Sequence, residues 1–345
     1  MLGDEGGALA ATVEGVGMEN TNAVTASSAN SWKRWLPRLS VSELIMPSFI
    51  VIYSIIITVI EPRFLSWGNL DNLASQIAPL LVMSVGQAFA IISGGLDLSM
   101  ASVMSLSGVV AILLVPTVGV WAAIFVMATF GMLTGLFTGY IIAYQRTTPF
   151  IVTLGMASVT TAIALILAHG VPIYTVPPEL VTVIGFGHFL GAPVSFEIAL
   201  AMLLLGSFLL RRTVFGRYVY AIGSNKSAAV RSGVNVAWYT MLVYGFTGFA
   251  TGVASIVLTS WVGAAQPVAE PDMTLKSIAA VVLGGIALNG GSGGMIHVLY
   301  GCIVLGALSN SLTLVGVSSF YQILAVGIVI IVAVMLDRVR RQEVF

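Results

Sequence analysis

The sequence predicts an all-α polytopic membrane protein with about ten transmembrane helices in two weakly related halves. Composition is the first reason: 58% of the 345 residues are hydrophobic, only 8% are charged, and the mean hydropathy is +1.02. A soluble globular domain of this length would not tolerate that composition. The second reason is a series of long apolar runs, and the third is an internal similarity between two glycine-interrupted segments.

A spanning helix needs about 20 predominantly apolar residues. On that rule the spans are predicted at residues 44–60, 70–92, 98–115, 119–144, 150–168, 194–210, 237–258, 276–288, 295–314 and 319–336. The eighth is short, which is typical of a discontinuous helix or of a segment that enters a protein-lined cavity.

The positive charges predict which ends of these spans face the cytoplasm. With the amino terminus inside, twelve of the fourteen Lys and Arg residues fall on the inner side, and only Arg63 and Lys276 lie on or near the outer side. Cytoplasmic loops carry an excess of Lys and Arg. We therefore expect both termini to be cytoplasmic.

Three regions follow from this topology. Residues 1–40 lack an apolar run and are rich in small polar residues, which predicts a disordered cytoplasmic tail. Residues 41–340 form the transmembrane domain, and residues 341–345 form a second cytoplasmic tail. The outer loops 169–193 and 259–275 are rich in proline and contain no Lys or Arg. They serve either as a docking surface for an external partner or as solvated connectors.

Several function classes are excluded. Cys302 is the only cysteine, and the three histidines have no metal-ligand spacing. No nucleotide-binding motif is present, so this chain is not expected to hydrolyse ATP. The net charge of zero offers no basic surface for nucleic acid. We expect no metal, no cofactor and no nucleic-acid partner, and a lipid bilayer as the surroundings.

The run Gly94-Gly95-Leu-Asp97-Leu-Ser99 interrupts the apolar sequence. A carboxylate inside a bilayer costs about 2.5 to 3.5 kcal/mol on insertion scales, so it is kept where it is solvated or hydrogen-bonded. Two glycines end a helix and free backbone groups, which Asp97 or Ser99 would cap as the next helix starts. We call residues 93–99 the first break.

The stretch Ala280 to Asn289 matches Ala90 to Ser99 position by position, including the glycine pair Gly284-Gly285. Corresponding glycine-interrupted segments in two halves point to a transport pathway, whereas small residues also serve close helix packing. Both interpretations stay open here. The residues predicted to line the pathway are Phe89, Ser93, Gly94, Gly95, Asp97, Ser99, Gly284, Gly285 and Asn289, with Asn310 as a further candidate.

The inner loop 212–236 is predicted to contain an ordered helix. Ser224 or Asn225 would cap a helix through residues 227–231 that ends at Gly233. A helix of two turns is marginal by itself, so it needs a surface to pack on. A cytoplasmic protein would provide one.

These stretches, together with 148–155, 316–320 and Gln266-Pro267, resemble the membrane permease subunits of ribose-type ABC importers, within the branched-chain amino acid and sugar permease superfamily. The similarity covers about residues 40–340. One departure is Ile286-Ala287 after the second glycine pair, where the family commonly has a threonine and a serine.

The resemblance implies a permease that imports a small neutral sugar, polyol or related signal. It implies a dimer, with itself or with a paralogous permease, a cytoplasmic ATP-binding subunit that hydrolyses the ATP, and a periplasmic substrate-binding protein. The inner loop would be the coupling helix that inserts into the surface of the ATP-binding subunit. A bulky residue at Gly223 or Ala229 is expected to uncouple transport without unfolding the chain. The implied coupling residues are Gly216, Arg217, Gly223, Asn225, Ala228, Ala229 and Gly233.

Other classes remain. An ion-coupled secondary transporter would use Asp97, but Glu197 is the only other acid in the middle of a span. A membrane enzyme would need a cluster of acids, histidines or a nucleophile, which is absent. The secondary transporter is the main alternative, and a branched-chain amino acid ABC permease, a distant relative in the same broad family, is a further one. The sequence does not distinguish between a pentose, a hexose, a polyol and a furanose-like signal.

Overall fold

Helix α2 (Trp67–Ile92) is the centre of the fold. In this computed structural model, which describes residues 41–342, α2 is buried over most of its length. It contacts α7 (Val194–Arg212), α10 (Val236–Val262), α11 (Met273–Gly284) and α12 (Met295–Leu314). All contacts described below lie within residues 46–342, which form one compact unit. The first residues of helix α1 (Val41–Ile60) belong to a separate unit, which ends at Ile45.

Each predicted span overlaps a helix. Besides the helices named above, the predicted spans correspond to α3 (Met100–Val118), α4 (Val120–Tyr144), α5 (Pro149–Leu167) and α13 (Ser319–Gln342). Within the described residues, seven helices are long and apolar enough to cross a membrane, and three apolar stretches are shorter: Ile45–Ile60, Met273–Gly284 and Phe320–Val329. The short eighth span is confirmed as the 12-residue α11. The count of ten crossings stays a prediction, and the tails at 1–40 and 343–345 lie outside the described residues.

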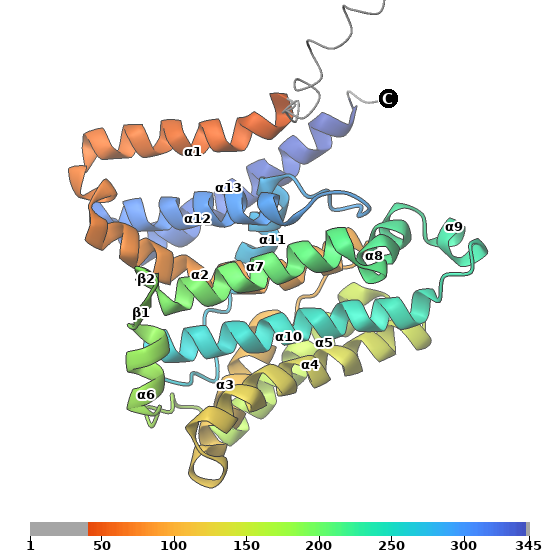
Figure 1. Cartoon of the computed structure of the whole chain (residues 1–345), viewed down its shortest axis with the longest axis horizontal. Coiled ribbons are helices and arrows are strands. Elements are labelled where there is room, and N and C mark those ends of the chain that lie inside the picture. The colour runs from red at the N-terminus through yellow and green to blue at the C-terminus, as the bar shows by residue number, and fades with distance from the viewer. Residues whose placement is uncertain (1–40, 343–345) are drawn as a thin grey trace, which may run out of the picture. The chain divides into compact units, whose positions relative to one another are not determined.

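The connecting segments gather at the two ends of the long helices (Figure 1). At one end lie α8 (Val214–Ser224) and α9 (Lys226–Arg231), between α7 and α10. At the other end lie α6 (Pro178–Leu180), a π-helical turn η3 (Val181–Gly185) and a hairpin of β1 (His188–Phe189) and β2 (Ala192–Pro193). We call these the α8 end and the hairpin end. The loop 169–193 is therefore structured, and its Ile173 pairs with Ala265.

Helices α4 and α10 pack with their backbones in close contact, and glycines make this possible. A Cβ atom on Gly248 would overlap the carbonyl oxygen of Gly131 and lie 2.9 Å from the Cα of Gly135. Gly252 on α10 likewise faces the backbone of Met127. Small residues spaced four apart are a common way for membrane helices to approach closely. The sequence contains this spacing, but it was not used above to predict the pairing.

Candidate functional site: two helix breaks joined to the α8 end

The first break begins with a Schellman motif at the end of α2. Gly94 has a positive φ of +83°, and its N–H donates to the carbonyl of Ile91 at 2.9 Å. The N–H of Gly95 donates to the carbonyl of Ala90, also at 2.9 Å. These two bonds satisfy carbonyls that the end of a helix leaves without partners, and glycine adopts the left-handed conformation without a Cβ penalty.

The chain after Gly95 is extended and held by side chains. Asp97 is 3% exposed, and its Oδ1 accepts hydrogen bonds from the backbone N–H of Ser99 at 2.9 Å and from the Ser99 hydroxyl at 2.6 Å. Tyr244, buried in α10, donates its hydroxyl hydrogen to the carbonyl of Leu96 at 3.2 Å. The carboxylate therefore fixes the shape of the break itself.

The prediction that Asp97 or Ser99 caps the next helix is wrong. Neither side chain accepts a hydrogen bond from a backbone N–H within α3, which begins at Met100. The N–H of Ala101 instead donates to the Thr274 hydroxyl at 2.9 Å. Because Thr274 belongs to α11, the start of the third span depends on the eighth.

The second break (residues 285–294) uses the same motif, shifted by one residue. Gly285 has φ +114°, its N–H donates to the carbonyl of Val282 at 2.9 Å, and the N–H of Ile286 donates to that of Val281 at 3.1 Å. The left-handed glycine is thus the first of the pair in the first break and the second of the pair here. The internal repeat predicted from the sequence corresponds to two like helix ends, one residue out of register.

The two breaks meet at the end of α8. The N–H of Gly291 donates to the carbonyl of Ile92 at 2.8 Å. Gly223 packs against both groups so closely that a Cβ atom there would overlap the Ile92 oxygen and lie 2.6 Å from the Gly291 nitrogen. Gly290 is also close, since its Cβ would lie 2.9 Å from the nitrogen of Gly94. We call these five residues the glycine junction.

Two further bonds connect α8 to the second break. The Tyr220 hydroxyl donates to the carbonyl of Gly293 at 2.7 Å, and the Ser224 hydroxyl donates to that of Gly291 at 3.4 Å. A displacement of α8 would therefore either break these bonds or move the second break with it. The sequence did contain a signal for this loop, the glycine-rich run Asn289-Gly-Gly-Ser-Gly-Gly294, which was not used above.

The inner loop holds two helices, where one was predicted. The prediction of α9 is confirmed: Asn225 Oδ1 accepts from the N–H of Ala228 at 2.9 Å, and Gly233 follows with φ +79°. Helix α8 was missed. It begins where the N–H of Gly216 donates to the Thr213 hydroxyl at 3.2 Å, and it buries only the residues Gly216, Val219 and Ile222 on one face.

The coupling candidates divide into a buried and an exposed group. Ala229 is 5% exposed and packs in a cluster with Ile222 and Val236 of this same chain. Arg217 and Asn225 are exposed, as is Gly233. The expectation that a bulky residue at Gly223 leaves the fold intact does not suit the geometry, because the glycine junction has no space for it.

Phe89 does not line any cavity described here. It is fully buried, with ring centroids 4.4 Å from Phe246 and 5.8 Å from Phe215. Gln87, two residues earlier in α2, is also fully buried, and both of its amide atoms have no hydrogen-bond partner among the described residues. Neither Gln87 nor Tyr244 was among the residues predicted to line the pathway.

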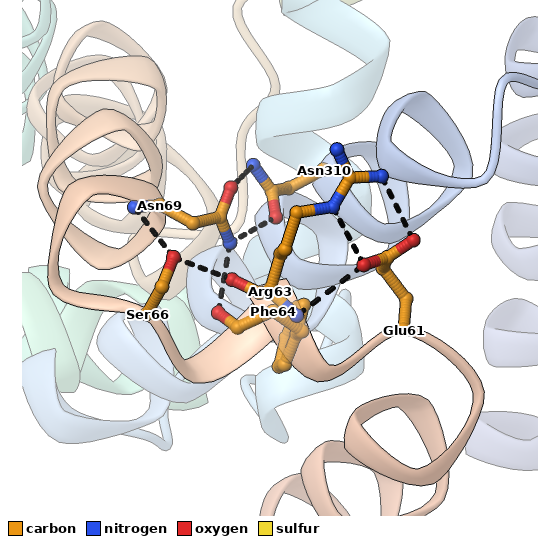
Figure 2. A network of polar contacts seen from close by, with 6 residues as sticks. All are labelled: Glu61, Arg63, Phe64, Ser66, Asn69 and Asn310. Carbon is orange, nitrogen blue, oxygen red and sulfur yellow. Dashed lines mark hydrogen bonds and ion pairs between the residues drawn. The ribbon is translucent and has the colours of Figure 1, made fainter.

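Asn310 of α12 forms a pair of reciprocal amide hydrogen bonds with Asn69 of α2, as Figure 2 shows. Asn69 Nδ2 donates to Asn310 Oδ1 at 2.9 Å, and Asn310 Nδ2 donates back to Asn69 Oδ1 at 3.0 Å. Asn69 Nδ2 also donates to the carbonyl of Phe64 in η2 (Pro62–Leu65). In the same turn, Arg63 donates to both carboxylate oxygens of Glu61, which lowers the pKa of Glu61.

We expect Asn69→Ala to lower the stability of the protein by about 1 to 3 kcal/mol, because it leaves the buried amide of Asn310 without its partner. The measurement is the midpoint of denaturant unfolding in detergent. Asn72→Ala is the matched control, since Asn72 is exposed one turn along the same helix. Equal midpoints for the two variants would contradict the assigned role of the pair.

A cavity lies at each end of the first break. The larger cavity, of about 560 Å³, is lined by Ser93, Gly94 and Gly95 and by Tyr244. The α5 cavity, of about 280 Å³, is lined by Leu98 and by other residues from α3, α5 and the segment 267–275. The stretch from Gly95 to Leu98 therefore separates two spaces, each wide enough to hold solvent or a small molecule.

Comparison with known proteins identifies the family. The family model of the branched-chain amino acid transport system permease component matches residues 69–334. The ribose import permease protein of Bacillus subtilis is 39% identical over 287 residues, which cover 82% of this chain and 89% of that protein. Its Escherichia coli counterpart is 35% identical, with the same shares, and the D-allose transport system permease protein of Escherichia coli is 31% identical over 277 residues, 80% and 85% of the two chains.

No solved structure matches the chain. The family match covers well over half of the sequence, and it includes both breaks and the loop that holds α8 and α9. The chain therefore belongs to this permease family, in the branch of ribose-type ABC importers, which are multi-pass proteins of the bacterial inner membrane.

Proposed function

We propose that this chain is the permease subunit of an ABC importer that moves a small neutral sugar or a related polyol across the inner membrane. The observation that carries the proposal is the first break, which separates two cavities and is joined through the glycine junction to the α8 end. A short extended segment between two cavities is suited to act as a barrier. Relatives described as importers of ribose and D-allose favour a sugar as the cargo.

The α8 end would face the cytoplasm. Helices α8 and α9, which carry Arg217, Lys226 and Arg231, lie at that end, and Arg211 is in the last turn of α7 just before α8. This is the clustering expected if cytoplasmic loops are rich in positive charge. With the amino terminus inside, ten crossings would return the carboxyl terminus to the cytoplasm.

An ATP-binding subunit would bind the exposed residues of α8 and α9. Its movement would reach both breaks at once, because Gly223, Tyr220 and Ser224 contact Ile92 and the second break. Small shifts of one packed element against another are an established way to change access to a site. Among the proposed coupling residues, Arg217 and Asn225 would touch the partner, and Gly216 and Gly223 would transmit its motion.

The hairpin end would receive the substrate-binding protein. Its exposed apolar side chains include Tyr174, Phe186 and Phe189, with 75%, 62% and 63% of their surfaces exposed. A second permease chain, identical or paralogous, would complete the pathway. Helix α5, which lines both cavities, has little of its surface buried, and that leaves it free to face such a partner.

The test is uptake of radiolabelled sugars by proteoliposomes that contain this chain, its ATP-binding subunit and its binding protein, with each omitted in turn. Transport that requires ATP and both partners supports the proposal. Uptake by this chain alone, driven by a proton or sodium gradient, would replace it with a secondary transporter. Uptake of leucine in preference to D-ribose, D-allose and L-arabinose would assign it to the amino acid branch.

Asp97→Asn is a second test that distinguishes an ATP-driven importer from an ion-coupled secondary transporter. We expect uptake within about twofold of wild type, because the amide oxygen of asparagine can accept the same two bonds from Ser99. Asp97→Leu, which cannot accept them, should lose most of the uptake. A proton-coupled role would instead be abolished by both substitutions, and the measurement is the initial rate of uptake at two pH values.

A further inference from the structure

We propose that a third cavity, beside α11, binds a polyhydroxylated solute; this inference rests on the proposed function and adds a binding site at the hairpin end. The α11 cavity has a volume of about 280 Å³, just below the roughly 300 to 1,000 Å³ typical of small-molecule pockets. Residues 267–276 separate it from the α5 cavity. Its polar and aromatic lining comprises Gln76, Trp261, Glu270, Asp272, Lys276, Ser309 and Gln322.

Three charged side chains form the polar side of the cavity. Lys276 Nζ lies 2.9 Å from a carboxylate oxygen of Asp272 and 3.4 Å from one of Glu270. All three are partly exposed, at 24% for Lys276, 35% for Asp272 and 42% for Glu270. One cation between two carboxylates leaves hydrogen-bond donors and acceptors available to a ligand, with one negative charge in excess.

Helix stability accounts for only part of this triad: Asp272 and Lys276 form an i,i+4 ion pair, and both carboxylates lie near the N-terminus of α11, where negative charge is favoured. Lys276 lies in the first turn of α11, where the helix dipole disfavours a cation. Asp272 stands at the N-cap, yet its side chain makes no capping hydrogen bond. Glu270 has a φ of +36°, a backbone conformation that is costly for a residue with a side chain.

The rest of the lining is suited to a sugar. A hydroxyl group both donates and accepts hydrogen bonds, so it needs donors and acceptors side by side, as the triad and the amide of Gln76 provide. Gln322 Nε2 is engaged by Thr313 and Val317, and that holds the side chain in place. Trp261 is partly buried and offers an apolar ring to the C–H face of a sugar. The excess negative charge disfavours an anion.

The position also fits. Trp261 lies next to the last residue of α10, Lys276 in the first turn of α11 and Gln322 in the first turn of α13. All three therefore lie toward the hairpin end, where the solute would arrive from the binding protein. The α11 cavity would hold the sugar before it passes the first break.

The experiment uses the full-length chain in lipid nanodiscs, with Trp261 kept and the other five tryptophans replaced by phenylalanine. Its fluorescence is titrated with D-ribose and, separately, with leucine. We expect a saturable change with D-ribose, at an apparent Kd on the order of millimolar, and none with leucine. Lys276→Met should raise that Kd by about fivefold or more. The control protein keeps only Trp121, which is 59% exposed at the start of α4, and should show no saturable change.

Sugar moved per ATP hydrolysed is then compared for Gln76→Ala and Asn72→Ala in the assembled transporter. We expect a decrease of about threefold or more for Gln76→Ala alone, with ATP hydrolysis still stimulated by the binding protein, which shows that the complex is folded.

A flat D-ribose titration, with sugar import intact, would overturn the site and leave the proposed function standing. Saturation by leucine would overturn the assignment to a sugar. Saturation by D-ribose without ATP-dependent import would support the site and refute the proposed function.

Discussion

Gly223→Ala is expected to lower ATP-dependent sugar uptake by about 10- to 100-fold. The added Cβ would overlap the carbonyl oxygen of Ile92 and press on the N–H of Gly291, so α8 must move away from both breaks. Overpacking of a close contact costs about 1 to 3 kcal/mol, and each 1.4 kcal/mol is a factor of ten in a rate. The measurement is the initial rate of uptake, together with the ATP hydrolysed per sugar moved.

The control for this substitution is Gly68→Ala. Gly68 also lies in a helix, but no atom lies within 4 Å of a Cβ placed there. Its replacement should be neutral or slightly stabilising, since alanine favours a helix by about 1 kcal/mol over glycine. If Gly223→Ala transports as well as Gly68→Ala does, the glycine junction has no part in coupling.

Gly135→Leu is expected to prevent most of the protein from folding. A Cβ at this position would overlap the carbonyl oxygen of Tyr244 and lie 2.9 Å from the Cα of Gly248, so a leucine forces α4 away from α10. The expected loss of stability exceeds about 3 kcal/mol, because the atoms in contact belong to the backbones of α4 and α10, which cannot rotate out of the way as a side chain can. Separating α4 from α10 would also withdraw Tyr244 from Leu96 in the first break.

The measurement is the fraction of detergent-extracted protein that elutes as a monodisperse peak in gel filtration. Gly155→Leu is the matched control, since Gly155 lies in α5 with no atom within 4 Å of its Cβ position. We expect the control to match wild type. A normal yield for Gly135→Leu would show that α4 and α10 need not be in contact for the chain to fold.

Much of the fold could be predicted from the sequence, because an apolar run near 20 residues has few alternatives to a membrane helix. Every predicted span overlaps a helix, and the cap of Asn225 and the stop at Gly233 were predicted from local residue preferences. The two breaks were also found, since a glycine pair ends a helix whatever surrounds it. These features depend on neighbours a few residues away.

What only the tertiary structure decided depends on partners far apart in the sequence. The sequence pointed to Asp97 or Ser99 as the cap of α3, but Thr274 caps it from α11. Asn310 was a candidate for the pathway, yet it pairs with Asn69 across two helices. Short motifs specify local conformation, whereas the partner of a buried polar group is chosen by which helix lies beside it. That choice needs the packed fold, because the same hydroxyl or amide can serve several partners equally well.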